Sequence, residues 1–283
     1  MFSLLRLSLP FLALAGVLGV TYRPTAEWML DRWAATGSYY GHGYLIPPIA
    51  LAWVFTLRQR IARATRAACR TGFAVTFAGL ALHAASEGLQ VHFTSGLSIP
   101  VVLAGCLLTI VGFTVFRILL APLFFLFFMV PMPLVAVSQA TLSLKLFATG
   151  AGVSILSLLG LPVVQEGSAI HIGTETLMVG DACSGLRSLI ALLAVGFLMV
   201  QRLSGGWLPR LAAYALVIPL AICGNVVRVV ALCLIANGFG AERLQGLVHD
   251  LTGMLIYVVT LAGLLAVVRW FEPTIRDAEG ALT

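Results

Sequence analysis

The sequence predicts an all-α polytopic membrane protein, and composition and length carry that prediction. Of the 283 residues, 60% are hydrophobic and 10% are charged, and the mean hydropathy is +1.03. A chain with so few polar groups cannot cover the surface of a water-soluble globule. Each crossing of a bilayer takes about 20 apolar residues, so the length predicts about eight transmembrane helices in a single integral membrane domain, residues 1–283.

Apolar runs predict where the spans lie. The expected spans are residues 4–20, 39–57, 71–88, 97–116, 118–133, 183–201, 209–232 and 251–270. The stretch 97–133 is too long for one crossing at about 1.5 Å per residue, and Gly112 and Arg117 mark the expected reversal. The first span is interpreted as a retained anchor, because no small-residue cleavage site follows Val20.

Basic residues orient the predicted spans. Five arginines and no acidic residue lie between positions 58 and 70, a pattern typical of a cytoplasmic loop. The formal charge of +6 therefore reflects the positive-inside rule, and it does not indicate nucleic-acid binding.

Residues 134–160 allow two interpretations, a span or a helix lying flat on the membrane. Lys145 at mid-helix would cost about 2.5 to 3.5 kcal/mol on insertion scales, and Pro131 and Pro133 permit a turn onto the surface. A flat helix leaves 11 loop basic residues inside and 3 outside, whereas a span leaves 8 and 6. The positive-inside rule therefore favours an interfacial amphipathic helix on the outer face.

Residues 161–180 alternate short β-prone pieces with Gly167 and Gly173. This pattern predicts a small β-hairpin on the outer surface. The whole segment 134–182 is thus expected to be extracytoplasmic and interfacial.

Cys183 is the candidate nucleophile. Asp181 is a predicted N-cap that would place Cys183 in the first turn of the sixth span, where the helix dipole lowers the pKa of a thiol. Ser184 and Gly185 leave room for a peptide backbone to approach. A single cysteine in a membrane helix is more often a small apolar residue. Cys183, however, is the one cysteine of five expected at the oxidising face.

Two further residues are expected near Cys183 on the outer side. Arg228 lies in the outer half of the seventh span, a costly depth for a charge. Asn225, three residues earlier, would orient its guanidinium group. His249 begins the eighth span and can exchange a proton near neutral pH. A thiol, an imidazole and a cation suit acyl transfer, and the histidine spacing matches no metal motif, so no metal or cofactor is expected.

These residues resemble the exosortases and archaeosortases, multi-span enzymes of the cysteine transpeptidase type, and the bacterial exosortase branch fits better. The resemblance covers most of the chain. Its matching pieces are Gly-His-Gly-Tyr-Leu-Ile-Pro at 41–47, Val-Pro-Met-Pro at 130–133, Leu-Gly-Leu-Pro at 159–162, Ala-Cys-Ser-Gly-Leu-Arg-Ser at 182–188, Asn-Val-Val-Arg at 225–228, and His249.

The resemblance implies a membrane protease or transpeptidase that cleaves a C-terminal sorting signal. Cys183 would attack the peptide bond, Arg228 would support the transition state, and His249 would act as acid or base. The substrates would be tail-anchored secreted proteins that end in a Pro-Glu-Pro-type motif, one membrane helix and a basic tail. The residues assigned substrate-binding or supporting roles are Arg187, Asn225, Ser184 and His42.

The expected location is the cytoplasmic (inner) membrane, with the active site facing the periplasm or the cell exterior. The expected partners are the protein substrates and the lipid bilayer. An alternative function is a transporter or scaffold of envelope polysaccharide assembly, in which Arg228 and the outer histidines line a path for an anionic substrate. No convincing internal repeat favours a transporter. A serine protease using Ser184 is a weaker alternative, because no serine–histidine spacing on the helices supports it.

Overall fold

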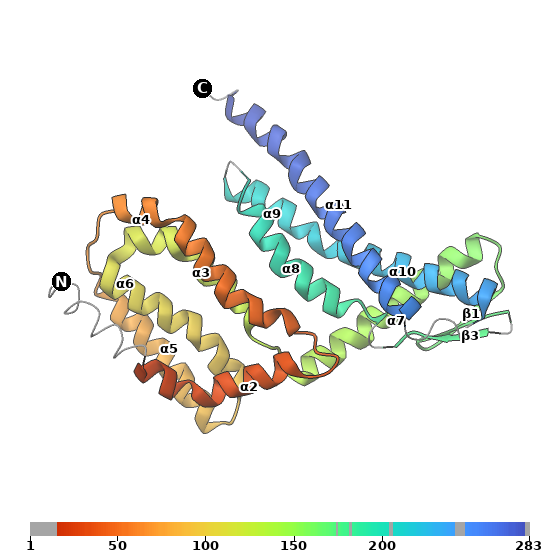
Figure 1. Ribbon diagram of the computed structural model, residues 1–283, viewed down its shortest axis with the longest axis horizontal. Helices are drawn as coiled ribbons and strands as arrows, with labels where there is room; N and C mark the ends of the chain where they lie inside the picture. The colour runs from red at the N-terminus through yellow and green to blue at the C-terminus, as the bar shows by residue number, and fades with distance from the viewer. Residues whose placement is uncertain (1–15, 174, 181–182, 204–205, 241–246, 281–283) are drawn as a thin grey trace. The chain divides into compact units, whose positions relative to one another are not determined.

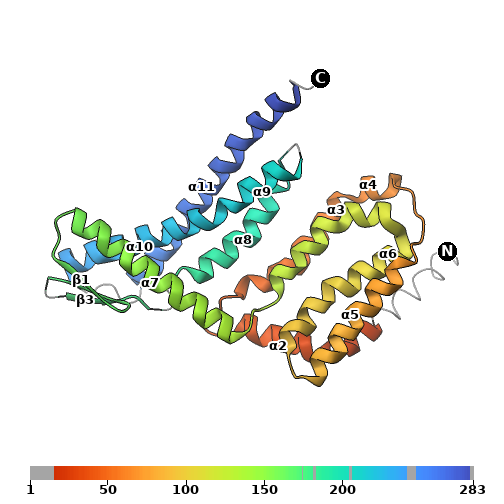
Figure 2. The same ribbon diagram turned by 180° about the vertical axis from the view of Figure 1, so that it is seen from behind.

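The computed structural model describes residues 16–173, 175–180, 183–203, 206–240 and 247–280, apart from the side chains of residues 247–250 and 272–280. Within these ranges the chain is mostly helical, as predicted (Figures 1 and 2). It divides into two compact units, Met1–Met132 and Pro133–Thr283. The prediction of a single membrane domain stays a prediction.

The first unit consists of helices around the α5 and α6 pair. Its elements are α2 (Arg23–Ala34), η1 (Gly41–Leu45), α3 (Ile46–Thr56), α4 (Arg58–Arg63), α5 (Thr71–Gly88), α6 (His92–Phe125) and η2 (Leu126–Met129). Helices α5 and α6 lie side by side (Figures 1 and 2). A Cβ at Gly79 of α5 would lie 2.7 Å from Cγ2 of Val102. Glycine is therefore what lets the two backbones approach so closely.

Gly112 interrupts α6. Its φ of 81° and ψ of 178° are not helical, and glycine adopts such a conformation at low cost. Ala67, from the arginine-rich segment, forms a β-bridge with Gly112, and a Cβ at Gly112 would collide with the Ala67 carbonyl. The reversal expected near Gly112 and Arg117 corresponds to a non-helical kink at Gly112 inside α6.

A buried polar network joins α2, α5 and α6. Tyr22 and Ser98 share a hydrogen bond of 2.7 Å. Ser95 bonds to Thr25 at 2.5 Å and to Nδ1 of His83 at 2.8 Å. Thr25, Ser95 and Ser98 are fully buried, and His83 is 6% exposed. Because buried polar groups are costly without partners, this network fixes the three helices in one register.

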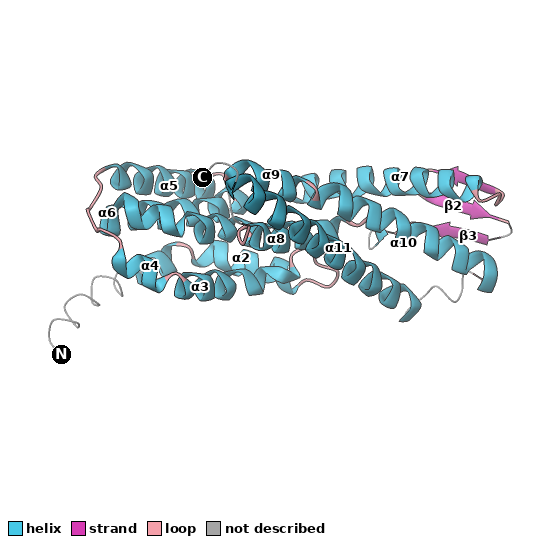
Figure 3. Cartoon of the chain, turned by 90° about the horizontal axis from the view of Figure 1, so that it is seen from above, coloured by secondary structure: helices cyan, strands magenta, loops and turns pink. Residues whose placement is uncertain are grey.

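The second unit contains all the residues predicted to carry chemistry except His42. Its elements are α7 (Leu134–Leu158), β1 (Val163–Glu166), β2 (Ala169–Ile172), β3 (Glu175–Met178), α8 (Leu186–Val200), α9 (Trp207–Ala215), α10 (Val217–Phe239) and α11 (Leu247–Gly280). The predicted hairpin is a three-stranded antiparallel sheet in the order β1-β2-β3, which lies at one end of α7 and α10 (Figure 3). Ile170 and Ile172 of β2 are fully buried in one apolar cluster with Leu156 of α7 and Leu232 of α10.

The eight predicted spans are not supported. Among the described residues, four helices are long and apolar enough to cross a membrane: His92–Met129, Leu134–Leu158, Trp207–Phe239 and Leu251–Phe271. The predicted spans 209–232 and 251–270 agree with the last two. The predicted spans 97–116 and 118–133 fall in His92–Met129, which counts as one candidate. Most of 4–20 lies outside the described residues.

Three other predicted spans fall short for local reasons. The span 39–57 contains α3, of only 11 residues, which starts at a pair of prolines. The span 183–201 contains α8, of only 15 residues. The span 71–88 matches α5 in length, but threonine, histidine and glutamate residues interrupt its apolar run.

The segment expected to lie flat is a continuous helix that meets the criteria for a span. Helix α7 has 25 residues, about 37 Å at 1.5 Å per residue, against a bilayer core of about 30 Å. Its polar residues bond to their own helix: Thr149 donates to the Lys145 carbonyl at 2.8 Å, and Ser154 donates to the Gly150 carbonyl at 2.9 Å. These bonds satisfy the hydroxyl groups within the helix. Helix α7 is therefore less polar than its serine and threonine residues suggest in the sequence.

Ser95→Ala is expected to destabilise the first unit by about 1 to 3 kcal/mol, because it leaves Thr25 and His83 without this buried partner. The measurement is the temperature at which half of the purified protein has unfolded in detergent. Ser138→Ala, at an exposed position of α7, is the matched control and should leave that temperature unchanged. Equal temperatures for both variants would contradict the role of the network.

Candidate active site

Cys183 lies in the loop between β3 and α8, ahead of the helix. Helix α8 begins at Leu186, and its N-cap residue is Gly185, with a left-handed φ of 79°. The prediction that Cys183 occupies the first helical turn is therefore wrong, because the positive φ at Gly185 takes the preceding chain off the helical path. Asp181, the predicted N-cap, lies outside the described residues. The Cys183 residue itself is only 4% exposed.

Asn225 of α10 fixes this loop. Its Nδ2 donates a hydrogen bond of 3.0 Å to the carbonyl oxygen of Cys183. Gly185 packs on the same side chain so closely that a Cβ there would lie 2.6 Å from Cγ of Asn225. Ser184 is buried, and its hydroxyl oxygen accepts a bond of 3.3 Å from the amide of Leu186. Asn225 was expected to orient Arg228, and the bond found positions the backbone of the candidate nucleophile.

Arg228 lies three residues beyond Asn225 on α10 and acts electrostatically on the thiol. Burial raises the pKa of Cys183 above its ordinary value, and the positive charge of Arg228 acts in the opposite direction. The prediction that the local environment lowers this pKa is therefore wrong in sign. Removal from water outweighs the cation, and the thiol does not occupy the first helical turn where the dipole would act.

Gly253 of α11 makes room for the Arg228 guanidinium group. A Cβ at Gly253 would lie 2.8 Å from Nη2 of Arg228 and 3.1 Å from Cζ. His249 lies four residues earlier in α11, which begins at Leu247. Residues four apart share one face of a helix, so the spacing places His249 one turn from Gly253. The side chain of His249 is outside the described residues.

Small residues let α10 pack closely against α8 and α11. The pairs of residues in contact also show how these helices run relative to one another. Added Cβ atoms show the closeness: Gly196 would meet Val217, Gly224 would meet Thr260, and Gly263 would meet Leu220. Together with the Gly185–Asn225 and Gly253–Arg228 contacts, these pairs show that α8 and α11 both run antiparallel to α10. Such contacts are the usual basis of helix association in membranes.

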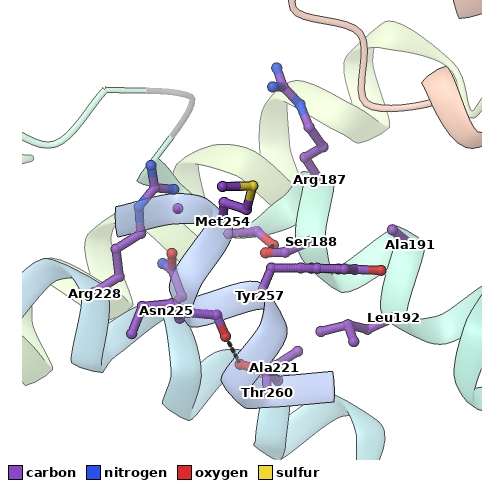
Figure 4. Close-up of a pocket in the computed structure, with 13 residues that line it drawn as sticks. Arg187, Ser188, Ala191, Leu192, Ala221, Asn225, Arg228, Met254, Tyr257 and Thr260 are labelled. Atoms are coloured by element: carbon purple, nitrogen blue, oxygen red, sulfur yellow. Dashed lines mark hydrogen bonds between the residues drawn. The ribbon is translucent and has the colours of Figure 1, made fainter. Parts of the chain in front are cut away.

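A pocket of about 340 Å³ lies between α8, α10 and α11 (Figure 4). Arg187, Arg228, Asn225 and Ser188 contribute the polar groups of one end. The apolar part is lined by Ala191, Leu192, Ala221, Ile256 and Tyr257. Among the described residues that line the pocket, two are arginines and none is acidic. The volume is within the range of small-molecule and peptide side-chain sites.

A family model described as transmembrane exosortase (Exosortase_EpsH) matches residues 33–266. The chain belongs to the transmembrane exosortase family. No curated protein and no solved structure matches it. The match to the exosortase family covers both units and includes Cys183, Arg228 and His249.

The other residues predicted for the exosortase site lie at different places. Arg187 is exposed on α8, and its guanidinium group points away from Leu192 and Tyr257 (Figure 4). His42 belongs to the first unit, in η1, with its ring 5.9 Å from that of Tyr40. Its supporting role stays a prediction. Among the described residues, no group of three or more histidine, cysteine or acidic side chains could hold a metal ion.

Sequence reasoning missed two features of this candidate site. Gly253 had no signal of its own, since its importance comes from contact with an arginine 25 positions earlier. Tyr257, which lines the pocket, follows Gly253 by four residues. The i, i+4 spacing of His249, Gly253 and Tyr257 could have identified one face of α11.

Arg228→Gln is expected to raise the pKa of Cys183 further, because it removes the cation that favours the thiolate. The rate at which iodoacetamide alkylates Cys183, measured against pH in detergent, should then begin to rise at a higher pH than in the wild type. Arg187→Gln, which removes an exposed arginine, is the control and should leave the profile in place. An unchanged profile in Arg228→Gln would contradict the electrostatic coupling.

Asn225→Ala is expected to lower stability by about 1 kcal/mol and to slow any reaction at Cys183, because the loop loses its bond to α10. Thermal unfolding in detergent measures the change in stability, and the rate of substrate processing measures the change in reaction at Cys183. Val227→Ala, at a side chain that is 54% exposed on the same helix, is the control. Full stability and activity of Asn225→Ala would show that this bond is dispensable.

Proposed function

We propose that this chain is a membrane cysteine protease or transpeptidase that cleaves the C-terminal sorting signal of secreted proteins through a thioacyl intermediate. The observation that carries the proposal is the attachment of Cys183 to α10 beside Arg228, whose charge acts on the thiol. Membership of the transmembrane exosortase family supports it.

The raised pKa of Cys183 defines what its chemistry needs. A buried thiol with a raised pKa is protonated near neutral pH, so a general base must remove its proton before attack. We assign this role to His249, whose ordinary pKa suits proton exchange at neutral pH. Its position one helical turn from Gly253, on which Arg228 packs, supports this assignment.

The proposed reaction has two steps. In the first, Sγ of Cys183 forms a bond to the carbonyl carbon of the substrate peptide, and the proton passes to His249. Arg228 donates hydrogen bonds to the oxyanion, the protonated His249 returns the proton to the leaving amine, and a thioester remains. In the second, water or an acceptor amine forms a bond to the thioester carbon and gives its proton to His249. The bond from that carbon to Sγ then breaks, and His249 returns the proton to Cys183.

The proposed substrates are tail-anchored secreted proteins with a Pro-Glu-Pro-type motif, one membrane helix and a basic tail. Cys183 precedes the apolar helix α8 by a short turn, and we place the motif, directly outside the substrate's membrane helix, level with Cys183. We assign Arg187 and Ser184 to binding the motif and shaping the loop, and His42 to a supporting role. The proposed location is the cytoplasmic membrane, with the site facing outward, and the envelope polysaccharide machinery is a candidate partner.

Cys183→Ala is expected to abolish processing of a tagged substrate that carries such a tail, followed by immunoblotting in membranes. Arg228→Ala should slow processing by roughly 100-fold to 1000-fold, as loss of an oxyanion donor does. His249→Ala should slow it by roughly 100-fold to 10,000-fold, as loss of a general base does. Cys223→Ala, which removes an exposed cysteine of α10, is the matched control and should process the substrate normally.

Mass spectrometry of the trapped enzyme completes the test. A substrate fragment attached to Cys183 through a thioester is the expected product. Normal processing by Cys183→Ala would refute the proposed function, because no other residue has been given the nucleophilic role.

A further inference from the structure

The pocket between α8, α10 and α11 extends away from the Cys183 loop along the helix axes. On α10 it runs from Arg228 to Ala221, and on α11 from Gly253 to Thr260. Each of these distances is seven residues, or about 10 Å along a helix. Because α10 and α11 run antiparallel to each other, the two stretches face each other along their length. The pocket is therefore a groove about two helical turns deep.

One end of this groove is continuous with the Cys183 loop. Gly185 and Asn225 both line it, and these are the residues that contact each other and fix the Cys183 carbonyl. Gly185 is two residues from Cys183, so this end of the groove is the one nearer to the candidate nucleophile.

The groove becomes mainly apolar with depth, and the Thr260 hydroxyl at its far end donates a hydrogen bond to the Ile256 carbonyl of its own helix. Arg228 and Asn225 lie at the Cys183 end, and Leu192, Ala221 and Tyr257 lie farther along it (Figure 4). The small side chain of Ala191 leaves the space open on α8, and the half-buried ring of Tyr257 bounds it on α11. An apolar group that enters this space gains by leaving water or polar headgroups.

We propose that this pocket is the specificity subsite for one large apolar side chain of the substrate, beside the Pro-Glu-Pro-type motif that Cys183 attacks. Ala191 and Tyr257 set the size of the side chain that it accepts. This inference rests on the proposed function, because it needs a substrate peptide at Cys183. Continuity with the Cys183 loop favours a peptide side chain over a lipid chain as the occupant.

The test uses reporter proteins with a sorting tail, in which the Pro-Glu-Pro-type motif is kept and each of the three positions on either side of the motif is Ala, Leu or Trp in turn. Initial processing rates are measured in membranes for the wild type, Ala191→Leu and Tyr257→Ala. Ala262→Leu, at an exposed position of α11 outside the pocket, is the matched control.

At one reporter position the two variants should shift the preference in opposite directions. Ala191→Leu fills the pocket and should lower processing of the Leu reporter by roughly tenfold or more relative to the Ala reporter. Tyr257→Ala enlarges the pocket and should raise processing of the Trp reporter relative to the Leu reporter. The control should keep the wild-type preference. Compensation between enzyme and substrate of this kind cannot arise from a folding defect, which lowers all rates together.

The inference is overturned if both variants process all reporters in the wild-type proportions. An equal fall for every reporter would then assign the pocket to a lipid or to helix packing, and unchanged rates would leave it without a role in selection. Cys183→Ala in the same assay separates this failure from failure of the proposed function. If it abolishes processing, the enzyme assignment stands whatever the pocket does.

Discussion

The candidate active site depends on one hydrogen bond, from Nδ2 of Asn225 to the carbonyl oxygen of Cys183. It joins a loop that comes from a small β-sheet to a helix 42 positions later in the chain. The adjoining Gly185 contact leaves no space for a larger residue. Because Arg228 lies three residues from Asn225, the same helix that fixes the loop also carries the cation that acts on the thiol.

The balance between burial and charge defines the chemistry open to this thiol. Burial stabilises the neutral form, and Arg228 recovers part of the stability of the thiolate. A cation in this position is therefore better suited to an oxyanion that exists only during the reaction than to a permanent thiolate. The glycines that let α8 and α11 approach α10 also matter here. The small side chains of Ala191 on α8 and Ala221 on α10 leave space between the helices for the pocket.

Much of the fold could be predicted because it follows from local patterns. The apolar runs located α10 and α11, glycine and arginine marked the break in α6, and alternating β-prone pieces marked the sheet. The number of spans could not be predicted in this way. Hydropathy cannot reveal that Thr149 and Ser154 bond to their own helix, or that α3 has only 11 residues and begins beside two prolines.

The sequence by itself determined that the chain is a helical membrane protein and which thiol, cation and imidazole to consider, since residue type and apolar runs are local properties. Only the tertiary structure decided that Cys183 precedes α8, that burial raises its pKa, and that Asn225 bonds to its backbone. The pocket and the contact of Gly253 with Arg228 also needed the packed helices. Desolvation and close approach depend on which residues meet across helices, and no local pattern in a single sequence contains that information.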